Sequence, residues 1–187
     1  EWKGFKTLQV MKLTDVDDKT IRDCQKEGVS LQELTRRFEK IFHEDLSKLN
    51  VLPAHYYPRA TEHVNDMLTI IQELIAHNKA YKSEDGSVYF KIDSFPDYGK
   101  LSGLKMADLQ AGASGRVKKD EYTKESASDF VLWKAYSPED GDVFWETKVG
   151  KGRPGWHIEC SAMSTRYLGY SFDIHTGGVD LIFPHHE

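Results

Sequence analysis

The sequence predicts an α/β fold in which a parallel sheet is interrupted by a smaller, irregular insertion that contains some β structure. Segments with helical apolar spacing alternate with short segments rich in β-forming residues, an order typical of βαβ units. Residues 93–128 are mostly polar, contain glycine clusters and show no sustained apolar period. Such a segment is typical of a loop-rich, mobile insertion.

The first part of the chain predicts a strand over residues 7–13, then helices over about 17–27, 31–49 and from 61 onward. The first helix follows short polar side chains that suit an N-terminus, and Gly28 is placed to end it. Ser30 and Glu33 fit a capping box for the second helix. Apolar residues at helical spacing, among them Val64 and Ile71, support the third.

The remaining elements are expected to be a hairpin or small sheet that begins near residues 84–92, a strand at 130–135, a glycine-rich loop at 150–155, a helix at 156–168, a buried strand at 172–175 and a truncated helix from Pro184. Gly86 marks a turn before the β-forming run of the hairpin. Gly169 is placed to stop the helix at 156–168, and the sequence shows no internal repeat.

The composition excludes several classes of protein. With 25 basic and 30 acidic residues the net charge is −5, which is not the global signature of a nucleic-acid binder. Two cysteines, Cys24 and Cys160, cannot form a secreted disulfide framework, so we expect a reducing cytoplasm. The chain lacks an apolar run of membrane-spanning length, so no membrane partner is expected. It begins without Met and stops after His-His-Glu, which indicates a piece of a longer protein.

A cluster of potential metal ligands occupies the last 35 residues. Zinc prefers thiolate, imidazole and carboxylate ligands, and Cys160 and His185 would supply two of them from separate elements. The alternative for Cys160 is a buried cysteine acting as a small hydrophobe. Cys24, between two polar residues, is interpreted as an incidental surface residue.

Other candidates have equally plain structural explanations. Trp156 shares a helix face with Cys160 and is either a pocket wall or a hydrophobic anchor. Gly177, Gly178 and Asp180 follow an expected strand, where they either meet a nucleotide ribose or form a turn.

Three acidic residues follow the first expected strand: Asp15, Asp17 and Asp18. They either contact a ligand's ammonium or a magnesium ion, or they cap the helix that begins there. The sequence leaves both interpretations open.

Taken together, several segments resemble the cysteinyl-tRNA synthetase family. They are TDVDDK (residues 14–19), PRATEH (58–63), YGKLS (98–102), DFVLWK (129–134), GRPGWHIECS (152–161) and FPHHE (183–187). The segments occur in the family's order and cover essentially the whole chain.

The resemblance implies a class I aminoacyl-tRNA synthetase and a Rossmann-like catalytic domain. Residues 1–60 and 150–187 would belong to that domain, and 61–149 to a connective-polypeptide insertion with a small β element. The implied reaction joins L-cysteine to ATP, with Mg²⁺, as cysteinyl-adenylate and transfers cysteine to tRNA(Cys). A cytoplasmic monomer is expected.

The resemblance also assigns binding residues. Cys160 and His185 match two of four zinc ligands, while the other two would precede residue 1 and follow Glu187. A zinc that binds the substrate thiol would exclude serine. Thr14, Trp156 and His175 match the cysteine pocket. The adenosine site is matched by Gly177, Gly178 and Asp180, next to Thr176, where family members often have glycine.

No catalytic residue is assigned, because the family's His-Ile-Gly-His and Lys-Met-Ser-Lys-Ser signatures do not occur in the chain. We therefore expect the isolated chain to have little aminoacylation activity and weak or no zinc. Two alternatives remain: the related cysteine ligase of mycothiol biosynthesis, and a non-catalytic metal-binding module. Metal-dependent hydrolysis, with the metal held by residues 185–187, is disfavoured because adjacent side chains on a helix diverge.

Overall fold

The computed structural model describes residues 3–103 and 129–186. Of the insertion expected over 93–128, residues 104–128 lie outside the described residues. In chain order the helices and strands are α1 (Asp18–Glu27), α2 (Leu31–Lys48), α3 (Val64–Ala76), β1 (Ala80–Lys82), β2 (Val88–Phe90), β3 (Phe130–Ala135), β4 (Trp145–Thr147), β5 (Gly150–Pro154), α5 (Trp156–Leu168) and α6 (Ile182–His185). Short 3-10 turns occur at η1 (Ala60–Glu62), η2 (Ile92–Ser94), η3 (Pro138–Asp140) and η4 (Val179–Leu181).

Helices and a sheet combine in the α/β class that the sequence predicts. The five strands are ordered β1-β2-β3-β5-β4, and every neighbouring pair is antiparallel. Parallel pairing is present in the described residues as two isolated bridges, Val10 with Tyr56 and Leu13 with Arg59. In the described residues, the parallel pairing that the sequence predicts is therefore limited to these two bridges, whereas the five-stranded sheet is antiparallel.

Three local predictions were wrong. Residues 7–13 and 172–175 form no strand among the described residues, and residues 150–154 form β5 in place of a loop. The glycines there serve close backbone approach: a Cβ on Gly152 would lie 2.1 Å from the Lys134 carbonyl oxygen, and one on Gly155 would lie 2.2 Å from that of Val131. Glycine at these positions lets β5 and the start of α5 lie against β3.

The helix predictions are confirmed to within a few residues. Asp17 caps α1 by accepting from the Thr20 backbone N–H, and Gly28 ends it with a φ of 69°. Ser30 accepts from the Glu33 N–H at the start of α2. The α3 helix begins at Val64, after η1 and three residues later than expected. Local side-chain caps thus fix the starts of α1 and α2.

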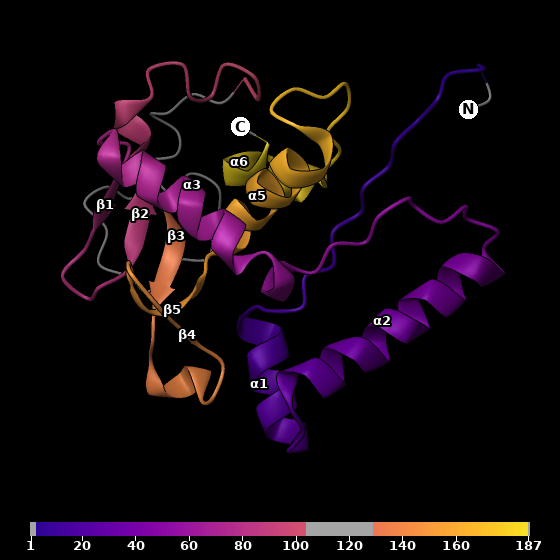
Figure 1. The fold of residues 1–187 in the computed structure, drawn as a ribbon, viewed down its shortest axis with the longest axis horizontal. Helices are drawn as coiled ribbons and strands as arrows, with labels where there is room; N and C mark the ends of the chain where they lie inside the picture. Colours follow the sequence, from indigo (N-terminus) through magenta and orange to yellow (C-terminus); the bar gives the residue numbers. More distant parts are fainter. Residues whose placement is uncertain (1–2, 104–128, 187) are drawn as a thin grey trace.

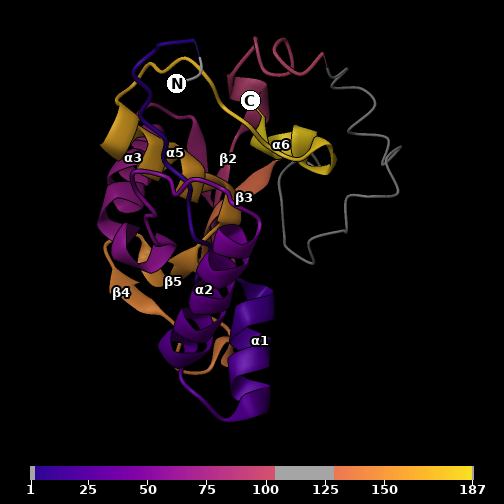
Figure 2. The same cartoon turned by 90° about the vertical axis from the view of Figure 1, so that its right-hand side faces the viewer.

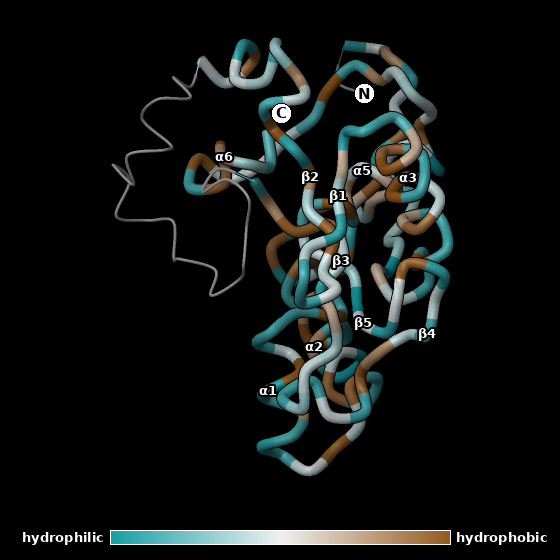
Figure 3. Tube along the Cα trace, turned by 90° about the vertical axis from the view of Figure 1, so that its left-hand side faces the viewer, coloured by the Kyte–Doolittle hydropathy of each residue, from teal (hydrophilic) through white to brown (hydrophobic). Residues whose placement is uncertain are grey.

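The core lies where α3 and α5 pack against the sheet (Figure 1). Its buried members are Val16, Ile21, Ala60, Val64, Met67, Ile71, Ala80, Val88, Leu132, Trp133, Val149, Ile158, Ala162 and Met163. Brown, apolar stretches of the tube on α3 and α5 mark these faces (Figure 3). The α1 helix lies at one end of the molecule and α6 toward the other (Figure 2).

The expectation that Cys24 is a surface residue was wrong. Its side chain is 3% exposed, and its thiol donates to the Ile21 carbonyl oxygen. The polar neighbours in sequence point away from the packed face of α1, because successive residues of a helix lie about 100° apart. Cys24 is a small buried residue of that face.

Candidate substrate and metal site at the start of α5

The first turns of α5 supply the central residues of the site. Trp156 is the first residue of the helix and Cys160 lies one turn later, so both side chains share a face. Both are half-buried. The short β5 strand leads directly into this helix through Gly155, so the packing of β5 on β3 fixes the position of the helix N-terminus.

Ring contacts bring three of the predicted residues together. The rings of Trp156 and His185 are stacked, with centroids 5.1 Å apart and planes at 22°. The His175 ring lies 5.8 Å from that of His185 in an edge-on arrangement. Segments of the chain separated by up to 29 positions thus meet at one place. Thr14 is half-buried and lies in the segment that leads into α1.

Lys12 is a site residue that sequence reasoning missed. Its Nζ lies 2.9 Å from Glu159 Oε2 and 4.6 Å from the centroid of the Trp156 ring. The available signal was its spacing from Thr14, because residues two apart in an extended segment point to the same side. The ion pair links the N-terminal extended segment to α5.

The environment shifts three titratable groups. Burial raises the pKa of Glu159 from 4.5 to about 7, although the Lys12 ammonium opposes the rise. Burial also raises the pKa of the Cys160 thiol, again against the effect of Lys12. The pKa of His185 falls to about 4, because of burial and then the charges of Lys12 and the neighbouring histidines. His185 is therefore a neutral imidazole at pH 7, with a lone pair free to bind a metal.

The donor set suits zinc in kind but not in number. A thiol and a neutral imidazole are typical zinc ligands, yet a structural zinc site needs four. Within residues 3–103 and 129–186 no group of three or more His, Cys, Asp or Glu side chains is arranged to hold a metal ion. Glu159 Oε1 and His186 Nε2 are buried and have no hydrogen-bond partner in that part of the chain. Cys160 and His185 alone do not complete a metal centre.

The predicted adenosine residues lie in an exposed segment before and within η4. A Cβ on Gly177 would lie 2.7 Å from His186 Nε2, and one on Gly178 would lie 2.5 Å from Asp180 Oδ1. A side chain at either position would therefore displace the side chain of His186 or of Asp180, and in both cases the nearest atoms belong to side chains and not to the backbone. The backbone here is bare, which allows a ligand to approach it closely.

The cavities in the described part of the chain include two of very different size. The larger, of about 590 Å³, lies between α1, α2 and residues 142–145. The smaller, of about 110 Å³, is lined by residues 16–18 and 153–157, together with Val131 and Lys134. Trp156 borders the smaller cavity, so size alone does not identify the site that the motifs predict.

Each of the three acidic residues after the first extended segment has a partner within the protein. Asp17 caps α1, with Oδ1 2.6 Å from the Thr20 backbone nitrogen. Asp18 forms ion pairs with Lys134, at 2.9 Å, and with Arg153. Asp15 accepts two hydrogen bonds from Thr61. These contacts favour the structural interpretation of the run over a magnesium site.

Comparison with known proteins identifies the class. The family described as tRNA synthetases class I (C) catalytic domain matches residues 1–187. A mixed helix and sheet fold, with the motif residues gathered at the start of α5, agrees with this class. The chain therefore belongs to the class I tRNA synthetase (C) catalytic domain family.

Curated relatives narrow the resemblance. Proteins named cysteine-tRNA ligase are 56% identical in Brachyspira hyodysenteriae and 54% identical in Protochlamydia amoebophila, each over 98% of this chain. A protein of the same name in Opitutus terrae is 52% identical over 100% of it. The chain spans 39%, 39% and 42% of these relatives' own lengths. In the described part of the chain, none of the helices combines the length and apolarity of a membrane crossing.

Proposed function

We propose that the protein is a cysteine-tRNA ligase, which activates L-cysteine with ATP and Mg²⁺ to cysteinyl-adenylate and transfers the cysteine to tRNA(Cys). The observation that supports this proposal most directly is the cluster at the start of α5. There Trp156 stacks on His185 and His175 contacts the same ring. Residues from distant segments, which the family resemblance assigns to the amino-acid pocket and to the metal, thus lie together at the start of α5.

The amino-acid pocket, in this proposal, is lined by Thr14, Trp156 and His175. The indole ring and the imidazole enclose the small side chain of cysteine and exclude water from it. Gly177, Gly178 and Asp180 bind the adenosine of ATP. The two glycines let the nucleotide approach the backbone, and the Asp180 carboxylate accepts a hydrogen bond from a ribose hydroxyl.

Zinc is the proposed cofactor, with Cys160 and His185 as two of its ligands and the remaining ligands outside this chain. When bound, the metal would supply recognition of the substrate thiolate, which the hydroxyl of serine does not match. The neutral state of His185 at pH 7 favours this role. Cys160 would have to lose its proton on metal binding, so zinc affinity should fall at acidic pH.

The organisation proposed for the whole protein follows the family. Residues 1–60 and 150–187 are assigned to the catalytic domain and residues 61–149 to the connective-polypeptide insertion. The first five residues after the proposed boundary at 149 form β5, which pairs with β3. We also propose a monomer that acts in the cytoplasm.

Cysteine-dependent exchange of pyrophosphate into ATP by the full-length protein tests the proposed reaction. We expect exchange with cysteine and an at least ~10⁴-fold lower efficiency with serine, because a site built around one strong contact rejects the analogue lacking it. His175→Ala should raise the KM for cysteine by roughly tenfold. His77→Ala, at the exposed end of α3, is the matched control and should leave it unchanged.

Two further measurements separate this proposal from its rivals. Transfer of cysteine to an amino-sugar in place of tRNA would show the mycothiol-type ligase. Zinc content, measured by mass spectrometry, should fall in Cys160→Ala and remain in Cys24→Ala. Bound zinc without any cysteine-dependent exchange would replace the proposal with a metal-binding module.

A further inference from the structure

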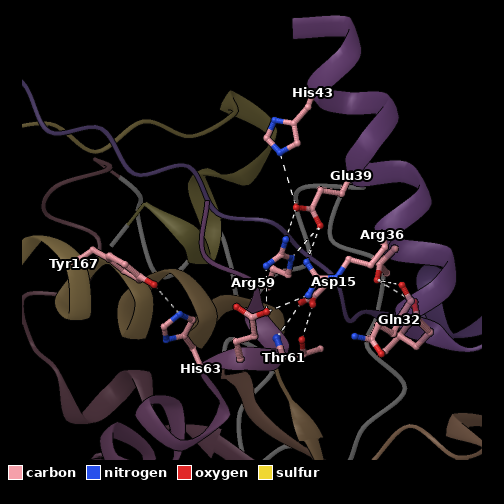
Figure 4. A network of polar contacts seen from close by, with 12 residues as sticks. Asp15, Gln32, Arg36, Glu39, His43, Arg59, Thr61, His63 and Tyr167 are labelled. Atoms are coloured by element: carbon pink, nitrogen blue, oxygen red, sulfur yellow. Dashed lines mark hydrogen bonds and ion pairs between the residues drawn. The ribbon is translucent and has the colours of Figure 1, made fainter. Parts of the chain in front are cut away.

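The segment of residues 58–63 has no role in the site described above, although its sequence is among the most specific in the chain. Figure 4 shows it at the centre of a polar network that joins the N-terminal extended segment to α2. The network begins at Asp15 and Thr61 and continues outward through Arg59, Glu62 and Glu39.

Asp15 and Thr61 form a two-point contact, referred to below as the clamp. The Thr61 backbone N–H donates to Asp15 Oδ1 at 2.9 Å, and the Thr61 hydroxyl donates to Asp15 Oδ2 at 2.5 Å. Asp15 is only 8% exposed. Hydrogen bonds to an ionised carboxylate are about twice as strong as neutral ones, and burial limits competition from water.

Backbone hydrogen bonds complete the attachment on the other side of Thr14. The Leu13 N–H donates to the Pro58 carbonyl oxygen at 2.8 Å, and the Leu13 carbonyl oxygen accepts from the Ala60 N–H at 3.2 Å. The residue before Thr14 is thus fixed through its main chain, and the residue after it through its side chain. Both attachments end on residues 58–61.

An outer group of ion pairs holds residues 58–63 against α2. Arg59 donates to both carboxylate oxygens of Glu39, with Nε 2.9 Å from Oε2 and Nη2 2.5 Å from Oε1. Glu62 Oε1 accepts from Arg59 Nη1 and from Arg36 Nη2, each at 3.1 Å. A bidentate arginine-carboxylate pair fixes orientation as well as distance. The segment that holds Asp15 is therefore itself anchored.

We propose that Asp15 and Thr61 are positioning residues that hold Thr14 in the amino-acid pocket, with Arg59 and Glu39 anchoring the clamp to α2. The inference rests on the proposed function, in which Thr14 contacts cysteine. The clamp should affect binding of the amino acid and not of the nucleotide, because the residues assigned to adenosine lie elsewhere, in the segment before and within η4.

The first test measures the clamp itself, by amide hydrogen exchange in the full-length protein. Thr61→Val removes the hydroxyl and keeps the shape, and it should speed exchange of the Leu13 and Thr61 amides about tenfold. Thr61→Ser, which keeps the hydroxyl, should restore protection. Thr69→Val on the exposed face of α3 is the matched control. Asp15→Asn is the second variant should Thr61→Val fail to fold.

The second test measures the effect on the substrate. In cysteine-dependent pyrophosphate exchange, Thr61→Val should raise the KM for cysteine about five- to tenfold and leave the KM for ATP unchanged, and Thr61→Ser should restore the wild-type KM. A merely structural role would lower the amount of folded protein without this split between the two substrates.

Each combination of results has a distinct meaning. Faster exchange at Leu13 together with a selective rise in the cysteine KM supports the proposal. Unchanged amide exchange in Thr61→Val overturns the clamp. Faster amide exchange with an unchanged KM for cysteine overturns its role in positioning Thr14. If the variants change amide hydrogen exchange as expected but the wild-type protein shows no cysteine-dependent pyrophosphate exchange, the clamp is supported and the proposed function is refuted.

Discussion

A buried ion pair between β5 and η3 gives the sharpest test of the fold. Arg153 Nε donates to Asp140 Oδ1 at 2.8 Å, and the two residues are 4% and 3% exposed. Asp140 Oδ2 also accepts from the Ser137 backbone N–H, at 2.9 Å, and from its hydroxyl. The Arg153 guanidinium reaches Asp18 as well, so one side chain connects β5, η3 and α1.

The substitution Arg153→Met should lower the opening free energy of this region by about 3 kcal/mol. Breaking a buried pair by removing one partner costs about 3–5 kcal/mol, because the other charge stays buried. The lower end applies here, since the two Ser137 donors still stabilise the Asp140 carboxylate. Adding Asp140→Asn to Arg153→Met removes the stranded charge. The double variant should therefore be less destabilised than the sum of the two single variants.

Amide hydrogen exchange of β5 and β3 in the full-length protein is the appropriate assay. A change of about 3 kcal/mol corresponds to roughly a hundredfold faster exchange. Arg166→Met, at an exposed position of α5, is the matched control and should alter exchange by less than about twofold. The reasoning is refuted if Arg153→Met and Arg166→Met change exchange in β5 to the same extent.

Four further predictions concern packing and pH. Gly155→Ala should disrupt the junction of β5 and α5 by about 3 kcal/mol or more, because its Cβ would meet a β3 carbonyl oxygen at 2.2 Å. Gly28→Ala, with no atom within 4 Å, should cost only the ~1 kcal/mol of its left-handed backbone, as thermal unfolding will show. Met67→Ala in the fully buried core should cost about 2–5 kcal/mol in the same measurement. The pKa of Asp18 lies below 3.8 because its contacts with Lys134 and Arg153 outweigh partial burial. A depressed folded-state pKa contributes stability above the unfolded value that is lost as pH falls through the folded value. The stability difference between wild type and Asp18→Asn should therefore be small, because the side chain is 71% exposed, and it should shrink as the pH falls below 3.8 toward the lowered folded-state pKa.

Much of the helical structure was predictable because its signals are local. The N-cap of α1 at Asp17, its left-handed end at Gly28 and the end of α5 at Gly169 all depend on residues within one turn of the helix terminus. The turn at residues 84–86 and the β-forming run that becomes β2 were also predictable, whereas its partner strand β1 was not identified from the sequence. No distant partner is needed to explain these features.

The site was predictable only in part. The motif residues Trp156, Cys160, His175 and His185 were identified because their sequence context is specific. Lys12 was not, because its spacing from Thr14 places it on the same side of an extended segment but does not identify Glu159 as its partner. Its ion pair with Glu159 joins residues 147 positions apart.

The sequence by itself determined the class of protein, the helix ends and the residues from which the candidate site is built, since each of these depends on short-range patterns. Tertiary structure decided how the strands pair and that the glycines of β5 serve close packing. It also decided that the acidic run forms a helix cap, ion pairs and the hydrogen bonds from Thr61. Those outcomes depend on which surfaces meet. Burial, charge and steric exclusion act between segments far apart in the chain, so they arise only once α3 and α5 have packed on the sheet and residues 58–63 lie against Asp15.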